Sequence, residues 1–184
     1  EADAAMYRAK ELGRNRSEMF DEVMRRDAFE RLRTESDLRR ALERDEFRVL
    51  YQPIFDTATL RPIAVEALVR WQHPTRGVVG PVEFIPLAEE TGLIAPLGRW
   101  VLEHAVAEVA GWAERFPDVP LRVAVNVSGQ QLARPEFLEE VRSALAASDL
   151  PPERLGLEIT ESILIKESGS PRSTLEALRE IGVK

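Results

Sequence analysis

The spacing of apolar residues divides the chain into a helical beginning and a longer part in which strand and helix patterns alternate. Over residues 17–46, apolar side chains recur every three or four positions among alternating arginines and acidic residues, which predicts a charged, solvated helix. Beyond this stretch, short β-rich runs predict strands. These strands are expected at Phe47–Ile54, Ile63–Arg70, Leu121–Asn126 and Leu155–Thr160.

Longer amphipathic stretches follow these runs and predict helices. They cover Val82–Thr91, Leu97–Phe116, Pro135–Ala147 and Ser170–Ile181. Alternating strands and helices favour a parallel sheet with helices packed outside it. We therefore expect an α/β fold, a partial (β/α)8 TIM-type barrel with about its first four strands, preceded by a helical linker. The barrel is expected to be partial because a complete one needs about 250 residues, and this chain has 184.

Composition excludes several classes of protein. The net charge of −7, from 25 basic and 32 acidic side chains, argues against a broad basic face for duplex DNA or RNA. The absence of cysteine excludes disulfides and thiolate metal sites, and no apolar run approaches the roughly 18 residues of a membrane span. The sequence begins within a helical pattern and ends just after a predicted helix, where a strand would normally follow. We therefore interpret the chain as an internal piece of a longer cytoplasmic protein. A membrane anchor in missing N-terminal segments of that protein is left open.

The strands carry the candidate chemistry on one of their two faces. In the last three predicted strands, one face is wholly apolar, and the other carries a single oxygen donor, Glu66, Asn126 or Glu158. Active sites of barrels lie at the C-terminal strand ends, so these donors are expected to converge there. Two carboxylates and an amide oxygen favour Mg²⁺ or Mn²⁺ over zinc. Arg70 shares the face of Glu66 and suits a phosphate.

Each of these features alone also has a structural interpretation. A single buried glutamate is more often ion-paired than metal-bound, and Asn126 alone would also suit the cap of a turn before the next helix. His73 is interpreted as a loop contact and His104 as a structural helix residue, which leaves a zinc site or a Ser-His-Asp triad poorly supported. Trp71, which follows Arg70, is left open between a core residue and a ligand platform.

Several ordered motifs resemble known signalling domains. Motifs similar to the start of an EAL domain are Tyr51–Ile54, Glu66–Trp71, Pro74 with Gly77, Pro81–Ala88, Asn126–Ser128 and Glu158–Ser162. Separately, Ala2–Lys10 and Gly13–Arg16 look like the closing helix of a GGDEF domain. The resemblance implies that residues 1–16 end a GGDEF domain, that 17–46 form a helical linker leading into the first EAL helix, and that 47–184 are the truncated N-terminal part of an EAL domain.

The resemblance also implies a function. EAL domains are β/α-barrel phosphodiesterases that hydrolyse the bacterial second messenger cyclic di-GMP to linear pGpG with Mg²⁺ or Mn²⁺. The implied metal ligands are Glu66, Asn126 and Glu158, the implied substrate contacts are Gln52 and Arg70, and the implied catalytic residues are Glu66, Glu158 and Glu161. Glu161 would support the hydrogen-bond network beside the metal. Implied partners are cyclic di-GMP, a second copy in a homodimer, and upstream GGDEF and sensor domains.

Part of the family's site lies beyond this sequence. The Asp-Asp-Phe-Gly loop, a catalytic lysine and further Glu and Gln positions would follow Lys184, so the chain alone is expected not to turn over substrate. A catalytically degenerate EAL domain, acting as a cyclic di-GMP receptor or a protein-interaction module, remains the alternative.

Overall fold

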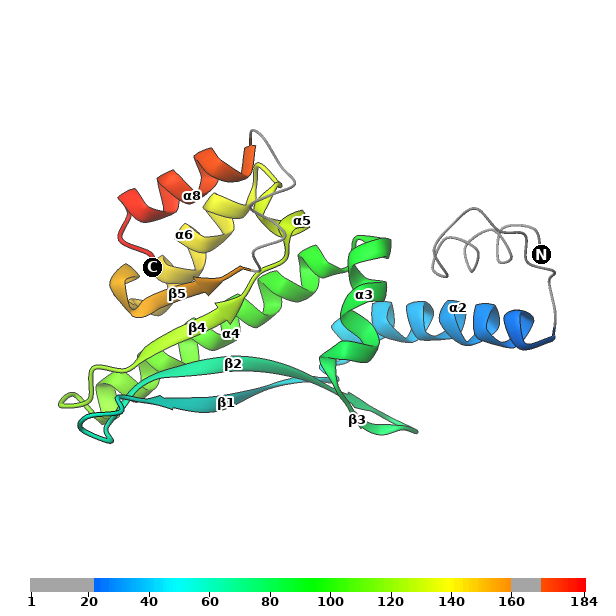
Figure 1. The fold of residues 1–184 in the computed structure, drawn as a ribbon, viewed down its shortest axis with the longest axis horizontal. Helices are drawn as coiled ribbons and strands as arrows, with labels where there is room; N and C mark the ends of the chain where they lie inside the picture. The colour runs from blue at the N-terminus through cyan, green and yellow to red at the C-terminus, as the bar shows by residue number, and fades with distance from the viewer. Residues whose placement is uncertain (1–21, 160–169) are drawn as a thin grey trace.

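The computed structural model describes residues 22–159 and 170–184 (Figure 1). Its helices are α2 (Glu22–Glu43), α3 (Pro81–Thr91), α4 (Ile94–Arg115), α5 (Gly129–Leu132), α6 (Phe137–Ser148) and α8 (Ser170–Glu180), with a 3₁₀ turn at Pro152–Arg154. Its strands are β1 (Phe47–Phe55), β2 (Pro62–His73), β3 (Gly77–Val79), β4 (Arg122–Asn126) and β5 (Leu155–Glu158). Within these described residues, the predicted strands and helices are confirmed to within a few residues. None of the helices in these ranges has the length and apolar character of a membrane span.

The strands form one sheet in the order β1-β2-β4-β5, with β3 paired to β2. As predicted, β2, β4 and β5 run parallel. Strand β1 instead runs antiparallel to β2, because the turn between them is too short for the dozen or so residues that a parallel crossover needs. Asp56 closes this turn: its N–H donates to the carbonyl of Arg61 at 2.9 Å, and its carboxylate accepts the N–H of Thr59 at 2.7 Å.

The parallel strands and their helices form an open part of a barrel wall. Helices α4, α6 and α8 lie on one side of the curved sheet, and the C-terminal ends of β2, β4 and β5 point the same way (Figure 1). We call this end the mouth. Lys184 extends the sheet beyond β5, donating its N–H to Leu155 at 3.0 Å and accepting that of Leu157 at 2.9 Å, as in a parallel pair. Across the described residues the sheet does not close.

The core lies between the sheet and its helices. The apolar faces of the strands meet the helices as predicted, and Val65, Ala67, Val123, Val125 and Leu155 are all buried there. The other face of the sheet is left for the polar residues of the site.

An aromatic cluster closes the core below the β2–β3 hairpin. Trp71 is 0% exposed and packs against Phe47 and Phe84, with ring centroids 6.0 Å and 5.9 Å away. Its indole N–H donates to Glu46 at 3.1 Å. Trp71 is therefore a core residue, and its interpretation as a ligand platform is wrong.

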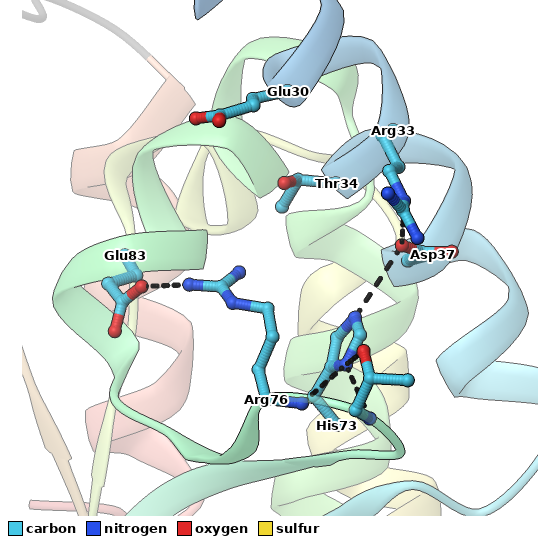
Figure 2. Close-up of a pocket in the computed structure, with 8 residues that line it drawn as sticks. Glu30, Arg33, Thr34, Asp37, His73, Arg76 and Glu83 are labelled. Atoms are coloured by element: carbon cyan, nitrogen blue, oxygen red, sulfur yellow. Dashed lines mark hydrogen bonds and ion pairs between the residues drawn. The ribbon is translucent and has the colours of Figure 1, made fainter.

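Helix α2 is fastened to the hairpin by polar contacts. Its solvated face carries ion pairs such as Arg39 with Glu35, as predicted, but Leu38 on its other face is fully buried. His73 is the buried last residue of β2 rather than part of a loop, and its role as a structural contact is confirmed. Figure 2 shows its ring facing Asp37 of α2 across the edge of a cavity of about 480 Å³.

The ring of His73 has a defined orientation. Its Nδ1 accepts the backbone N–H groups of Thr75 and Arg76 at 3.2 and 3.3 Å, and its Nε2 lies 3.5 Å from Oδ2 of Asp37. An Nδ1 that accepts two N–H groups leaves Nε2 to carry the ring proton and face the carboxylate. The hairpin and the helix thus meet through a charge-assisted contact.

The replacement Asp37→Asn is expected to destabilise this junction in a pH-dependent way. The hydrogen bond from Arg40, together with that from His73, holds the pKa of Asp37 below its ordinary value. A lowered pKa in the folded state contributes stability above the ordinary carboxyl pKa and loses it as the pH falls through the folded value. We expect a loss of about 1–2 kcal/mol in the free energy of unfolding at pH 7. The difference in the free energy of unfolding between the wild-type protein and Asp37→Asn should become smaller below a pH of about 4.

Urea denaturation at pH 7 and pH 3 measures this difference. The matched control is Asp45→Asn, which alters an exposed ion pair with Arg48 at 3.4 Å and should change the free energy by less than about 0.5 kcal/mol. An equal deficit at both pH values would contradict the electrostatic account of Asp37.

Candidate active site

The three predicted oxygen donors lie together at the mouth. Asn126 and Glu158 are the last residues of β4 and β5 and are paired in register. Glu66 is paired with Ala124 of β4, two positions before Asn126. The side-chain amide of Asn126 donates to Oε1 of Glu66 at 2.8 Å. The predicted convergence of these side chains on one face is therefore confirmed.

The turn after β4 explains why Asn126 is available to Glu66. Ser128, not Asn126, caps the following helix α5, because its hydroxyl accepts the N–H of Gln131 at 3.2 Å. The interpretation of Asn126 as a turn cap is thus wrong. The N–H of Val127 donates to the carbonyl of Glu158 at 2.9 Å, which joins the ends of β4 and β5.

Strand β1 adds polar side chains to the same face. Gln52 is the register partner of Glu66, and Arg48 is the partner of Arg70, so each pair projects on one side of the sheet. The guanidinium of Arg70 donates to the carbonyl of Val69 at 2.9 Å. Arg48 is not among the predicted site residues, although the alternation of side chains along a strand places it on the same face as Gln52.

A cavity of about 550 Å³ lies between the mouth and helices α3, α4 and α5. Its polar lining includes Asn126, Gln131 and Glu158, and its apolar lining includes Ile85 and Leu97. Gln52 and Arg70 lie outside it, on the open part of the sheet. Asn126 and Glu158 line the cavity and also lie on the open face of the sheet, so the two regions are continuous at these residues.

The donor set fits a hard divalent cation. No group of three His, Cys, Asp or Glu side chains that could hold a metal occurs within 22–159 and 170–184, so the candidate site consists of two carboxylates and an amide. Because Asn126 uses its nitrogen on Glu66, its Oδ1 is the oxygen that remains for a ligand. Carboxylate and amide oxygens are donors that Mg²⁺ and Mn²⁺ accept readily.

Tyr51, beside Gln52, does not supply a base. It lies on the helix side of β1, where its ring meets that of Trp112 edge-on at a centroid distance of 4.9 Å. Burial, with a smaller effect from the charge of Glu108, raises the pKa of Tyr51 to about 12. The phenol therefore stays protonated at neutral pH.

The other predicted residues lie elsewhere. Glu161 falls outside the described ranges, so its role stays a prediction. His104 belongs to α4, where its ring stacks on that of Trp100 at 3.9 Å between centroids and its Nδ1 meets the Trp100 carbonyl at 2.8 Å. Its structural interpretation is confirmed.

Comparison with known proteins identifies the family of this chain. A family model described as EAL domain matches residues 35–184. The chain is 40% identical over 184 residues to cyclic di-GMP phosphodiesterase PdeR of Escherichia coli (strain K12), covering 100% of this chain and 27% of PdeR. It is 41% identical over 182 residues to the bifunctional diguanylate cyclase/cyclic di-GMP phosphodiesterase MucR of Pseudomonas aeruginosa, covering 99% of this chain and 26% of MucR. The chain thus spans about a quarter of the length of these relatives.

Solved structures agree with the sequence matches. The PaMucR phosphodiesterase in complex with c-di-GMP is 39% identical, with a TM-score of 0.78, over 82% of this chain and 61% of that one. The FimX EAL domain of Xanthomonas citri in complex with c-diGMP is 25% identical, with a TM-score of 0.75, over 87% of this chain and 61% of that one. The open α/β sheet described above is thus similar to part of each of these longer chains.

Proposed function

Because this chain belongs to the EAL domain family, we propose that it supplies one part of the active site of a phosphodiesterase that hydrolyses cyclic di-GMP to pGpG. The observation that carries the proposal is the meeting of Glu66, Asn126 and Glu158 at the mouth, with a 2.8 Å hydrogen bond between the first two. Relatives about 40% identical over the chain are named cyclic di-GMP phosphodiesterases, which supports the choice of substrate.

In this proposal Glu66, Asn126 and Glu158 hold Mg²⁺ or Mn²⁺. When bound, such an ion lowers the pKa of a water molecule and polarises a phosphoryl oxygen. The two carboxylates balance the charge of the cation, while Asn126 adds a neutral donor. Asn126 also orients Glu66 through its amide N–H. Glu161 is assigned a supporting catalytic role on the resemblance alone.

The substrate's phosphates would meet the cationic part of the open face. Arg70 and Arg48 are paired directly across β2 and β1, which brings two guanidinium groups to one part of the open face, where Arg48 also pairs with the exposed carboxylate of Asp45 at 3.4 Å. A guanidinium also suits a phosphate because it donates two parallel hydrogen bonds. Gln52, the partner of Glu66, would add a neutral contact to the dinucleotide.

The replacement Arg70→Ala should mainly weaken substrate binding. Loss of one charge-assisted hydrogen bond, worth about 1.5 kcal/mol, is expected to raise KM about tenfold and to leave kcat nearly unchanged. Steady-state pGpG formation by the longer parent protein measures both constants. Arg142→Ala, on the exposed side of α6, is the control. An unchanged KM would contradict the assignment of Arg70.

The chain by itself is proposed not to turn over substrate. The sheet does not close over the described residues, so a substrate at the mouth would contact only one side of a complete barrel. Chromatography of cyclic di-GMP incubated with Mg²⁺ should give pGpG with the parent protein and none with this chain. Binding by the parent without any pGpG would refute the hydrolase proposal and support the receptor alternative.

The N-terminal residues of the chain are proposed to connect two domains of the parent protein. Residues 1–16 would end a GGDEF domain, and residues 17–46 would form a helical linker that leads into the first EAL helix, with the match to the EAL family model beginning at residue 35. MucR, which aligns with 99% of this chain, is named a diguanylate cyclase as well as a phosphodiesterase. That name supports a cyclase domain upstream in the parent protein.

A further inference from the structure

Gln131 is a buried polar residue beside the candidate metal ligands. It is 4% exposed, and its Oε1 accepts hydrogen bonds from the backbone N–H and the hydroxyl of Ser128, each at 3.1 Å. The backbone N–H of Gln131 donates to the Ser128 hydroxyl at 3.2 Å. This reciprocal capping box closes the turn between β4 and α5.

Gly98 of α4 provides the space that Gln131 occupies. A methyl group at Gly98 would overlap Nε2 and Cδ of Gln131, whereas a methyl group at Gly111 of the same helix would meet nothing within 4 Å. The amide cannot simply swing aside, because its oxygen is held by Ser128. The capping box therefore requires a residue without a side chain at position 98.

The capped turn carries Asn126. Only Val127 separates Asn126 from Ser128, and the N–H of Val127 is bonded to the carbonyl of Glu158 at 2.9 Å. The turn is therefore fixed by β5 on one side and by Gln131 on the other. With its backbone fixed, the Asn126 amide reaches Oε1 of Glu66 at 2.8 Å.

We propose that Gln131, seated on Gly98, is a positioning residue that fixes the turn after β4 and thereby aims the side chain of Asn126. The inference rests on the proposed function, in which Asn126 is a metal ligand. Replacing a group that orients a metal ligand typically weakens metal binding 10- to 100-fold. Gln131 itself need not touch the cation.

Crystal structures of the metal-free protein test the positioning directly. Gly98→Ala and Gln131→Met should both lose the hydrogen bond between Asn126 and Glu66, while Gly111→Ala should keep it. Gln131→Glu should also keep it, since Glu is the other residue that suits this capping position. An Asn126–Glu66 bond that survives in Gln131→Met would overturn the proposal, and this holds even where Gly98→Ala does not fold.

Titration of the parent protein with Mn²⁺ alone tests the consequence for metal binding. Gly98→Ala and Gln131→Met should weaken Mn²⁺ binding about 10- to 100-fold, with no change in Gly111→Ala. Unchanged affinity in both variants, where Asn126→Ala does weaken binding, would overturn the positioning role. Equal affinity of the wild-type protein and Asn126→Ala would instead refute the proposed metal site, and the crystal structures would then decide the positioning role alone.

A double variant separates contact from general destabilisation. If Gly98 acts only through Gln131, adding Gly98→Ala to Gln131→Ala should change Mn²⁺ affinity less than twofold, because the overlapping side chain is gone. Additive losses would show that Gly98 acts by another route and would contradict the proposal.

Discussion

Replacement of Glu66 by alanine is expected to abolish Mg²⁺-dependent formation of pGpG by the parent protein. Glu66 is the carboxylate to which Asn126 donates its amide hydrogen at 2.8 Å, so the change removes one proposed ligand and the orienting partner of another. Charge stabilisation by a bound metal is worth several kcal/mol, and each 1.36 kcal/mol is a factor of ten in rate. We expect a loss of about 1,000-fold or more in kcat/KM.

Chromatographic quantification of pGpG measures this loss. The control Glu103→Ala removes an exposed carboxylate of α4 that pairs with Arg99 and lies outside the site, so its activity should match that of the wild-type protein. A Glu66→Ala protein with wild-type turnover would refute the ligand assignment. Thermal melts of both variants ensure that folded proteins are compared.

Replacement of Trp71 by alanine is expected to cause the largest loss of stability. Trp71 is fully buried between Phe47 and Phe84, and truncating such a side chain typically costs about 3–5 kcal/mol through lost burial and the cavity left behind. Trp71→Phe retains an aromatic ring but loses the N–H bond to Glu46, so it should cost about 1–2 kcal/mol.

Chemical denaturation monitored by circular dichroism measures both changes. Phe116→Ala is the aromatic control, because Phe116 is 53% exposed at the end of α4 and its truncation should cost less than about 1 kcal/mol. If Trp71→Ala cost no more than Phe116→Ala, the aromatic cluster would not be part of the stabilising core.

The sequence predicted the features that depend on local periodicity. The alternation of apolar and polar residues in a strand assigns each side chain to a face, and that sufficed to place Glu66, Asn126 and Glu158 on one side of the sheet. The same alternation identified the buried faces, including Val65 and Val125. These inferences needed no knowledge of register, because parallel strands of a barrel share one direction.

Features that depend on pairing between distant residues could not be obtained in this way. Alternation along β1 places Arg48 on the face of Gln52, but its position opposite Arg70 follows only from the antiparallel register of β1 and β2. Gln131 and Gly98 are far apart in the sequence, and no local pattern shows that one fills the space left by the other. The hairpin strand β3 is three residues long, too short for alternation to be visible.

The reversed direction of β1 determines where helix α2 enters the barrel. Because β1 begins at the mouth, the connection from α2 lies there too, and the carbonyl of Glu46 accepts the N–H of Gln72 at 2.7 Å. Gln72 is two residues beyond Arg70. A twist or axial shift of α2 would therefore move the mouth first, where the candidate substrate contacts lie. The opposite end of the barrel would be displaced only by movement transmitted along the strands.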